Sequence, residues 1–335
     1  MSVLVVMAHF DVARTLRKHT AAAIRNYADS AARVVVVSTS GIGEADLESL
    51  PMNVDFVTRP NYGYDFFSYK WALDLVGDYA AYDRLVIVND TFVGPVVSLL
   101  EILNSEQAAK NDLMGMTWSV NHGGHAQSFF VTVSSAVSRS NGFQRFWRDM
   151  EPVSDRRSVI MQYEVGMTLA VTDSGFSAGG YLEPTVEEGA LAQERRRHHD
   201  EVRVIPRSGG MILGRTRPAT DEILRAYNPA VALADRLLTD LRLPLLKFDT
   251  LRFDPYGLGA DRLLREAESA LPEHMAGVRD FLRETRPNYP FRPREHNRLE
   301  DPIALARSGL GYCTDAAFTQ LSLIHISEPT RRYAI

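Results

Sequence analysis

Two acidic residues lie in positions where one could accept a proton and the other could stabilise a charged leaving group. Asp90 follows the apolar run 85–88, and Glu164 precedes the apolar run 165–171. A carboxylate at the end of a strand can hold a divalent cation that bridges two phosphates, or it can cap a turn. We expect Tyr163 and Glu164 to open an apolar helix, 165–171. A glutamate in the first turn of a buried helix accepts a proton from a substrate, or complements the helix dipole. Asp90 and Glu164 are therefore the candidate catalytic residues, with both alternatives open for each.

Further polar residues follow or precede other apolar runs. They are His9, Asp11, Asn61, Gly63, Asp65, Asn89, Thr91, His125 and Gln127. Gly63 would let the backbone approach a ligand closely, and the helix that we expect to start at Phe66 favours a phosphate at its N-terminus, with Asp65 as N-cap. A plain turn with a capped helix is the alternative for Asn61 to Asp65, as a polar loop leading into a strand is for His125 and Gln127.

The elements that position these residues alternate along the chain. Apolar, β-branched runs at 3–7, 34–38, 54–57, 85–88 and 113–117 are separated by helical patterns, among them 15–28 and 66–76. This alternation predicts an α/β fold with a mostly parallel sheet that is covered by helices on both faces. In such sheets the ligand crevice lies beyond the carboxyl ends of the strands, where the polar residues stand.

Composition excludes several functional classes. The chain has 335 residues, 45% of them hydrophobic, and a net charge of -5, which gives no basic surface for nucleic acid. The single cysteine, Cys313, indicates a reducing compartment and hence a cytoplasmic location. No apolar stretch approaches the ~20 residues that span a bilayer, so we expect any membrane contact to be peripheral. No Gly-x-Gly-x-x-Gly turn follows the first run, which argues against a dinucleotide oxidoreductase.

Taken in order, the polar segments resemble the rhamnan synthesis F family. The resemblance rests on residues 8–11, Asn61-x-Gly63-x-Asp65-Phe66 with residues 68–70, residues 82–83 leading to 89–91, Gly94-Pro95, Gly115-x-Thr117, residues 125–130 and 163–164, Asn228-Pro229 and residues 244–247. The same order is similar to the inverting glycosyltransferases of the cellulose and chitin synthase type. The resemblance implies a GT-A-like, Rossmann-type sheet and an inverting transfer of a deoxyhexose, rhamnose, from a nucleoside diphosphate to a growing cell-surface polysaccharide.

The resemblance also implies roles for individual residues. Glu164 would be the general base, and Asn89 to Thr91 would occupy the position of the metal motif, with Asp90 on a Mg²⁺ or Mn²⁺ ion. This motif usually has two acids, so the alternative is that Lys70, Lys247 or arginines neutralise the diphosphate. Asn61 and Gly63 would line the nucleotide pocket and Asp11 would contact the nucleotide. The substrate-binding set is completed by residues that place sugar, acceptor or phosphates: His9, Asp65, Lys70, Asn89, Thr91, His125, Gln127 and Lys247.

The expected partners follow from this activity. They are a nucleoside diphosphate sugar, a lipid-linked glycan acceptor, and a peripheral contact with the inner membrane or an export machinery, with no nucleic acid. The altered motif at 89–91 also allows a degenerate GT-A module that binds a glycan or nucleotide without turnover.

Three regions are expected along the chain. Residues 1–217 would form the GT-A-like domain, with the charged residues 187–217 as an exposed excursion, and residues 218–320 a helical C-terminal region. Residues 321–335 resemble the translated read-through of a sequencing adapter, and we expect them to be a non-native tail.

Overall fold

A computed structural model describes residues 1–207, 210–215 and 227–288 of the chain. Cys313 and the predicted tail 321–335 lie outside the described residues. The chain divides into two compact units, the first with residues 1–183 and 241–245, the second with residues 184–240 and the remainder from 246. The sequence placed this boundary after residue 217.

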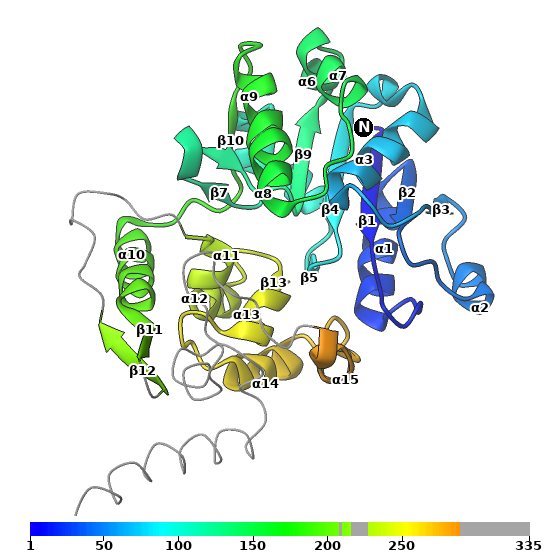
Figure 1. The fold of residues 1–335 in the computed structure, drawn as a ribbon. Coiled ribbons are helices and arrows are strands. Elements are labelled where there is room, and N and C mark those ends of the chain that lie inside the picture. The colour runs from blue at the N-terminus through cyan, green and yellow to red at the C-terminus, as the bar shows by residue number, and fades with distance from the viewer. Residues whose placement is uncertain (208–209, 216–226, 289–335) are drawn as a thin grey trace, which may run out of the picture. The chain divides into compact units, whose positions relative to one another are not determined.

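The first unit contains a mixed β-sheet with helices on both faces (Figure 1). Its strands are β1 (Val3–His9), β2 (Arg33–Ser38), β3 (Val54–Thr58), β4 (Arg84–Asn89), β5 (Phe92–Val93), β6 (Leu113–Gly115), β7 (Trp118–Ser119), β8 (His125–Ala126), β9 (Phe130–Ser134) and β10 (Ala178–Gly180). Its helices are α1 (Lys18–Ser30), α2 (Glu44–Glu48), α3 (Tyr64–Val76), α4 (Leu99–Leu103), α5 (Glu106–Lys110), α6 (Ser135–Ser138), α7 (Asn141–Arg148), α8 (Arg156–Ser158) and α9 (Gly166–Thr172). Single 3₁₀ turns span Tyr79–Ala81 and Asn121–Gly123, and a π-helical stretch, Val159–Val165, joins α8 to α9.

Within the described residues the main sheet has seven strands in the order β10-β6-β9-β4-β1-β2-β3. The pairs β1–β2, β1–β4, β2–β3 and β10–β6 are parallel, and β9 runs antiparallel to both β4 and β6. The prediction of a mostly parallel sheet with flanking helices is confirmed. Because β1 to β4 run in one direction, their carboxyl ends meet at one edge, where Ala8 is paired with Asn89 and His9 with Ser38.

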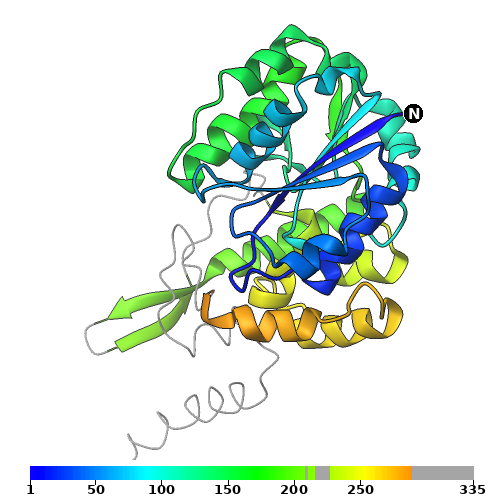
Figure 2. The same cartoon turned by 90° about the vertical axis from the view of Figure 1, so that its right-hand side faces the viewer.

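Alternate residues of the strands pack on opposite faces of this sheet. On one face, Leu4 and Val6 belong to the main apolar core together with Phe66 and Trp147. On the other face, the ring centroid of Tyr27 in α1 lies 6.3 Å from that of Phe130 in β9. Figure 2 shows the helices on either side of the sheet. The central strands are buried on both faces, which explains why they are apolar at nearly every position.

The second unit is mainly helical in its described part. It contains α10 (Val186–Glu201), the antiparallel pair β11 (Val202–Arg207) and β12 (Gly210–Arg215), α11 (Pro229–Ala232), α12 (Ala234–Asp240), β13 (Leu246–Lys247), α13 (Phe248–Phe253), α14 (Ala260–Ala270), α15 (Val278–Thr285) and a 3₁₀ turn, Arg286–Asn288. Arg195 of α10 donates through both guanidinium nitrogens to the carboxylate of Asp235, at 2.7 Å each. The charged segment after residue 186 thus begins as a helix that pairs with α12.

No helix among the described residues is long and apolar enough to cross a bilayer.

Candidate active site

The antiparallel direction of β9 explains why separate polar segments meet in the first unit. Residues 125–128 precede β9, and the backbone nitrogen of Asn89 donates to the carbonyl oxygen of Phe129 at 3.0 Å. The start of β9 therefore lies beside the carboxyl end of β4. This arrangement brings the His125 segment to the edge that already holds His9, Asp11 and Asn89.

His9 ends β1 and is buried, with 3% of its surface exposed. Its Nδ1 lies 2.9 Å from the hydroxyl of Ser38, which accepts hydrogen bonds from the backbone nitrogens of Ser40 and Gly41. The Ser38 hydroxyl also lies 3.3 Å from that of Ser40. Because the contact with Nδ1 is shorter, we assign the Ser38 hydroxyl hydrogen to it and the ring hydrogen of neutral His9 to Nε2. Burial lowers the pKa of His9 to about 4, although the nearby Asp11 carboxylate raises it. His9 is therefore an uncharged donor at neutral pH.

Asp11 is also buried, and its partners lie within its own loop. Its carboxylate pairs with Nε of Arg17 at 2.6 Å and accepts from the backbone nitrogen of Ala13 at 2.8 Å. These contacts fix the loop after β1. Contact of Asp11 with a nucleotide stays a prediction.

Asp90, Asn89 and Asp65 form a second group, at the end of β4. The side-chain amide of Asn89 donates to Oδ2 of Asp65 at 2.9 Å, and its carbonyl oxygen accepts from the hydroxyl of Thr91 at 2.6 Å. Oδ2 of Asp90 accepts from the backbone nitrogen of Phe10 at 2.7 Å. Desolvation raises the pKa of Asp90 to about 7, the Phe10 hydrogen bond opposes this, and the Asp65 carboxylate adds to it. Asp90 is thus a carboxyl group that titrates near neutral pH.

Glu164 lies within a helix and not at its start. The helical backbone begins at Arg156, with Asp155 as N-cap, and Glu164 belongs to the π-helical stretch. The prediction that Glu164 opens a helix is wrong, because the polar residues 155–158 already form its first turn. A carboxylate stabilises the helix dipole only from the first turn of the helix. Glu164 lies beyond that turn, so complementing the dipole is excluded as its role. π-Helical stretches are frequent at functional sites.

The carboxylate of Glu164 is held by two residues that precede β9. Its Oε2 accepts from both the backbone nitrogen (2.9 Å) and the hydroxyl (2.5 Å) of Ser128, and its Oε1 lies 3.4 Å from Nε2 of His125. Burial raises the pKa of Glu164, but the hydrogen bonds from His125 and Ser128 outweigh it and lower the pKa below 4.5. A carboxylate offers about four acceptor positions. The contacts with Ser128 and His125 therefore use three of these positions, two on Oε2 and one on Oε1.

Tyr69, which the sequence analysis did not assign to the site, connects the two carboxylate groups. Its side chain is fully buried, and its hydroxyl donates to the carbonyl oxygen of Ser128 at 3.4 Å. Burial raises the pKa of Tyr69 well above its usual range, and the carboxylates of Asp65, Asp90 and Glu164 add to this shift. The hydroxyl thus stays neutral, and the negative charges of all three carboxylates act on it.

The residues at this site fit a divalent cation that takes only part of its ligands from the protein. Among the described residues no group of three or more His, Cys, Asp or Glu side chains is arranged to hold a metal ion. Burial is the main cause of the raised pKa of Asp90, and repulsion by the Asp65 carboxylate adds to it. Mg²⁺ commonly takes one or two carboxylates and completes its shell with substrate phosphates and water. Metal binding by Asp90 stays a prediction.

Other predicted residues have structural contacts of their own. Gly63 has a φ of 72°, and a Cβ there would lie 2.6 Å from Cβ of Phe67, so the turn requires glycine. The prediction that Asp65 caps a helix starting at Phe66 is wrong, because α3 begins at Tyr64 with Gly63 as its N-cap and Asp65 lies in its first turn. Asn61 is exposed in the same loop. Oε1 of Gln127 accepts from the hydroxyl of Thr117 at 2.6 Å. Ligand contacts of these residues stay predictions.

The two predicted lysines lie elsewhere. Nζ of Lys70 donates to the carbonyl oxygen of Trp147 at 2.9 Å and pairs with Asp74 at 3.2 Å, so it binds the C-terminal end of α7, where a cation is favourable. The structure does not bring it to Asp90 or Glu164. Lys247 is buried in the second unit. Its contact with a diphosphate stays a prediction.

The chain matches known proteins in part. The model of a family described as Rhamnan synthesis protein F matches residues 34–206, just over half of the chain. The uncharacterized protein y4gN of Sinorhizobium fredii is 24% identical over 159 residues, which cover 45% of this chain and 41% of that protein. The chain thus spans about two fifths of the length of this curated relative.

Similar solved structures include the galactosyltransferase LgtC in complex with donor and acceptor sugar analogs, with a TM-score of 0.32 and 15% identity over 53% of this chain and 72% of that one. An active-site mutant of LgtC has a TM-score of 0.35 and 16% identity over 56% and 77%. The bifunctional glycosyltransferase WbbM has a TM-score of 0.28 and 13% identity over 44% and 34%.

Proposed function

Because the chain belongs to the rhamnan synthesis protein F family, we propose that it is an inverting glycosyltransferase that transfers a deoxyhexose, rhamnose, from a nucleoside diphosphate to a growing cell-surface polysaccharide. The observation that carries this proposal is the state of Glu164. This carboxylate is ionised at neutral pH, is held through Oε2 by Ser128, and keeps an acceptor position on Oε1. A base of this kind is what activation of a sugar hydroxyl requires.

In the proposed reaction the acceptor hydroxyl donates its proton to Oε1 of Glu164. The acceptor oxygen forms a bond to the anomeric carbon of the donor sugar on one face, while the bond from that carbon to the diphosphate oxygen breaks on the other. The low pKa of Glu164 keeps it ionised but makes it a weak base. Proton transfer therefore accompanies or follows formation of the new bond, because only then is the acceptor oxygen acidic enough.

In this proposal, negative charge develops on the departing diphosphate near Asp90. Asp90 and Asp65 would hold a Mg²⁺ or Mn²⁺ ion, which would neutralise that charge when bound. His9 would donate from Nε2 to an oxygen of the substrate, and His125 and Gln127 would place the sugar or acceptor.

The proposed acceptor is a lipid-linked glycan. An enzyme that extends it would work in the cytoplasm, with a peripheral contact at the inner membrane or an export machinery.

A panel of nucleotide sugars tests the proposal. Thermal unfolding is measured with UDP- and dTDP-linked hexoses and deoxyhexoses, with and without Mg²⁺ or Mn²⁺. A ligand at 100 times its Kd adds about 2.7 kcal/mol to the free energy of unfolding, which gives a clear rise in Tm. We expect the largest rise with a nucleoside diphosphate deoxyhexose. The absence of a rise with every nucleotide sugar would overturn the assignment of a donor site.

Turnover then separates an enzyme from a binding module. Release of the nucleoside diphosphate is followed with the preferred donor and a lipid-linked glycan acceptor. Stabilisation by the donor without release under any condition would favour the degenerate module, for which the single acid at 89–91 is the motivating feature.

A further inference from the structure

Arg59 is a buried cation that neither the predicted site nor the proposed mechanism uses. It directly follows β3, and only 2% of its surface is exposed. Among the residues that the structure describes, its hydrogen bonds go to carbonyl and hydroxyl oxygens. Burial lowers its pKa, and the Asp65 carboxylate, which attracts it through space, opposes this shift. A buried charge is costly unless hydrogen bonds satisfy its donors. The hydrogen-bond partners of the guanidinium therefore indicate the role of Arg59.

The partners of the guanidinium are carbonyl oxygens of the loop that follows it. Nη1 donates to the carbonyl oxygens of Pro60 at 2.8 Å and Tyr62 at 2.7 Å, and Nη2 donates to that of Tyr64 at 2.9 Å. Nε donates to the hydroxyl of Ser68 in α3 at 3.0 Å. Loop 60–64 is thus wrapped around the guanidinium, and the first turns of α3 are tied to it.

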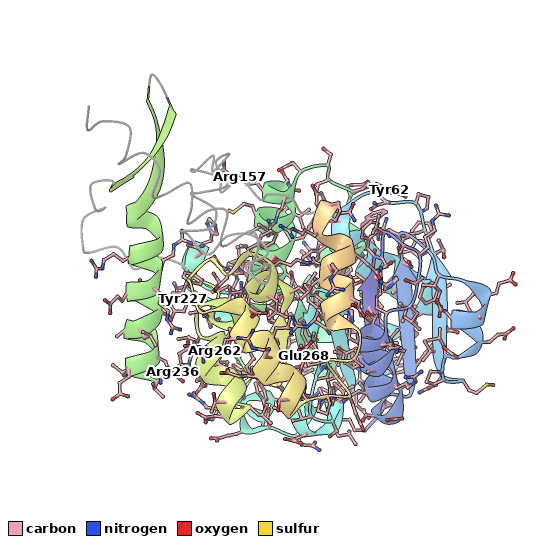
Figure 3. The ribbon with its side chains drawn as sticks, turned by 90° about the horizontal axis from the view of Figure 1, so that it is seen from below. Tyr62, Arg157, Tyr227, Arg236, Arg262 and Glu268 are labelled. Atoms are coloured by element: carbon pink, nitrogen blue, oxygen red, sulfur yellow. The ribbon has the colours of Figure 1, made fainter. Side chains whose placement is uncertain are left out.

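Aromatic rings close this arrangement. The guanidinium carbon lies 5.4 Å from the ring centroids of both Tyr62 and Phe67, and these two rings lie 5.2 Å apart. The ring of Tyr62 is 44% exposed, at the surface of the first unit (Figure 3). The cation–π contacts hold the loop from the side that faces solvent.

The conformation that Arg59 holds is an unfavourable one. Gly63 and Tyr64 have φ values of 72° and 56°, and a non-glycine residue such as Tyr64 rarely adopts a positive φ. The next residue is Asp65, whose carboxylate accepts from Asn89 beside Asp90. The position of Asp65 therefore depends on the loop that the guanidinium fixes.

We propose that Arg59 is a positioning residue of the donor site, whose guanidinium fixes loop 60–64 so that Asp65 is held against Asn89, beside Asp90. This inference rests on the proposed function, in which these residues receive the nucleoside diphosphate. Lysine would not replace arginine, because its ammonium is a point charge with three donors and lacks the planar fork that reaches three carbonyl groups at once.

The test compares Arg59→Lys with Arg33→Lys. Arg33 lies on β2 in the same unit and pairs with Asp55 at the surface, so its substitution keeps the charge and leaves the loop untouched. The Kd for UDP and dTDP is measured by calorimetry, and the KM values for donor and acceptor are measured below both Tm values. We expect Arg59→Lys to raise the donor KM and the nucleotide Kd tenfold or more, with the acceptor KM within twofold of wild type.

A purely structural role would lower Tm without this split between the two KM values. Unchanged nucleotide affinity in folded Arg59→Lys would overturn the inference. Should Arg59→Lys fail to fold, Ser68→Ala removes only the Nε hydrogen bond, and we expect it to raise the donor KM severalfold; an unchanged donor KM would then overturn the inference. Failure of wild-type protein to bind either nucleotide would instead count against the proposed function.

Discussion

Replacing Glu164 by glutamine separates a catalytic role from a structural one. Glutamine has the same shape and keeps an acceptor for the backbone nitrogen and hydroxyl of Ser128, but it does not accept a proton from a sugar hydroxyl. General base catalysis contributes roughly 10² to 10⁴-fold. We therefore expect Glu164→Gln to lower kcat at least 10²-fold, while the Kd for the donor stays near that of wild type.

The structure also bounds the effect on stability. Hydrogen bonds to a charged group contribute about 1.5–3 kcal/mol against 0.5–1.5 for neutral ones, so the substitution should cost roughly 1–2 kcal/mol. For a unit of this size that corresponds to a fall in Tm of roughly 2 to 8 °C. If Glu164 only held Ser128 in place, the same 1–2 kcal/mol would limit the loss of turnover to about 5- to 30-fold. The two roles thus predict distinct losses.

The assay follows release of the nucleoside diphosphate from the preferred donor at saturating acceptor. The exposed Glu101 of α4 provides the control, and Glu101→Gln should leave kcat unchanged. The lowered pKa of Glu164 means that its contribution to stability is present above pH 4.5 and is lost as the pH falls through the lower, folded-state value. The stability difference between wild type and Glu164→Gln should therefore be constant above about pH 5 and shrink below pH 4.5. Near-normal kcat in folded Glu164→Gln would remove Glu164 from the mechanism.

Four further predictions address other parts of the chain. Because the pKa of Asp90 is raised from 3.8 to about 7, wild type should lose stability relative to Asp90→Asn as the pH rises from about 4 to 7. Unfolding in EDTA measures this difference. Asp90→Asn should also abolish any pH dependence of the response to Mg²⁺ near pH 7. The lowered pKa of His9 means that wild type should lose stability as the pH falls from 6.5 to 4, and that His9→Gln should remove this dependence. Tyr69→Phe should reduce kcat/KM no more than about tenfold, the value of one neutral hydrogen bond, with the fold checked by circular dichroism. Deletion of residues 321–335 should leave Tm unchanged in a scanning calorimeter, and a marked fall would show that these residues belong to the fold.

The strands could be predicted because burial on both faces of the sheet restricts them to apolar residues. Val34 to Val37 are fully buried on both faces of the sheet, and a run of β-branched residues is the pattern that such a strand requires. The place of the site followed from the same step, since the carboxyl ends of parallel strands form one edge. This reasoning placed His9 and Asn89 at the carboxyl ends of β1 and β4, where the structure has them.

The contacts within the site could not be predicted, because they depend on the direction of one strand. Ser128 meets Glu164 only because β9 runs antiparallel between β4 and β6, and residue types do not reveal the direction of a buried strand. Tyr69 fitted the pattern of an apolar helix face and gave no sign of its hydroxyl contacts. Arg59 is a lone cation after a strand, and its three carbonyl partners appear only once the loop is folded.

The start of the helix that contains Glu164 decides whether this residue complements the helix dipole or has another role. The apolar run 165–171 suggested that the helix begins at Tyr163, and in that position a glutamate complements the helix dipole. Asp155 accepts a hydrogen bond from the backbone nitrogen of Ser158 at 2.9 Å, the usual sign of an N-cap, three residues before that nitrogen. Recognising this cap in the sequence would have placed Glu164 in the middle of the helix, beyond its first turn. A buried carboxylate there has no dipole to complement, so its interactions with Ser128 and His125 need another reason, and acceptance of a proton is the one that Glu164→Gln tests.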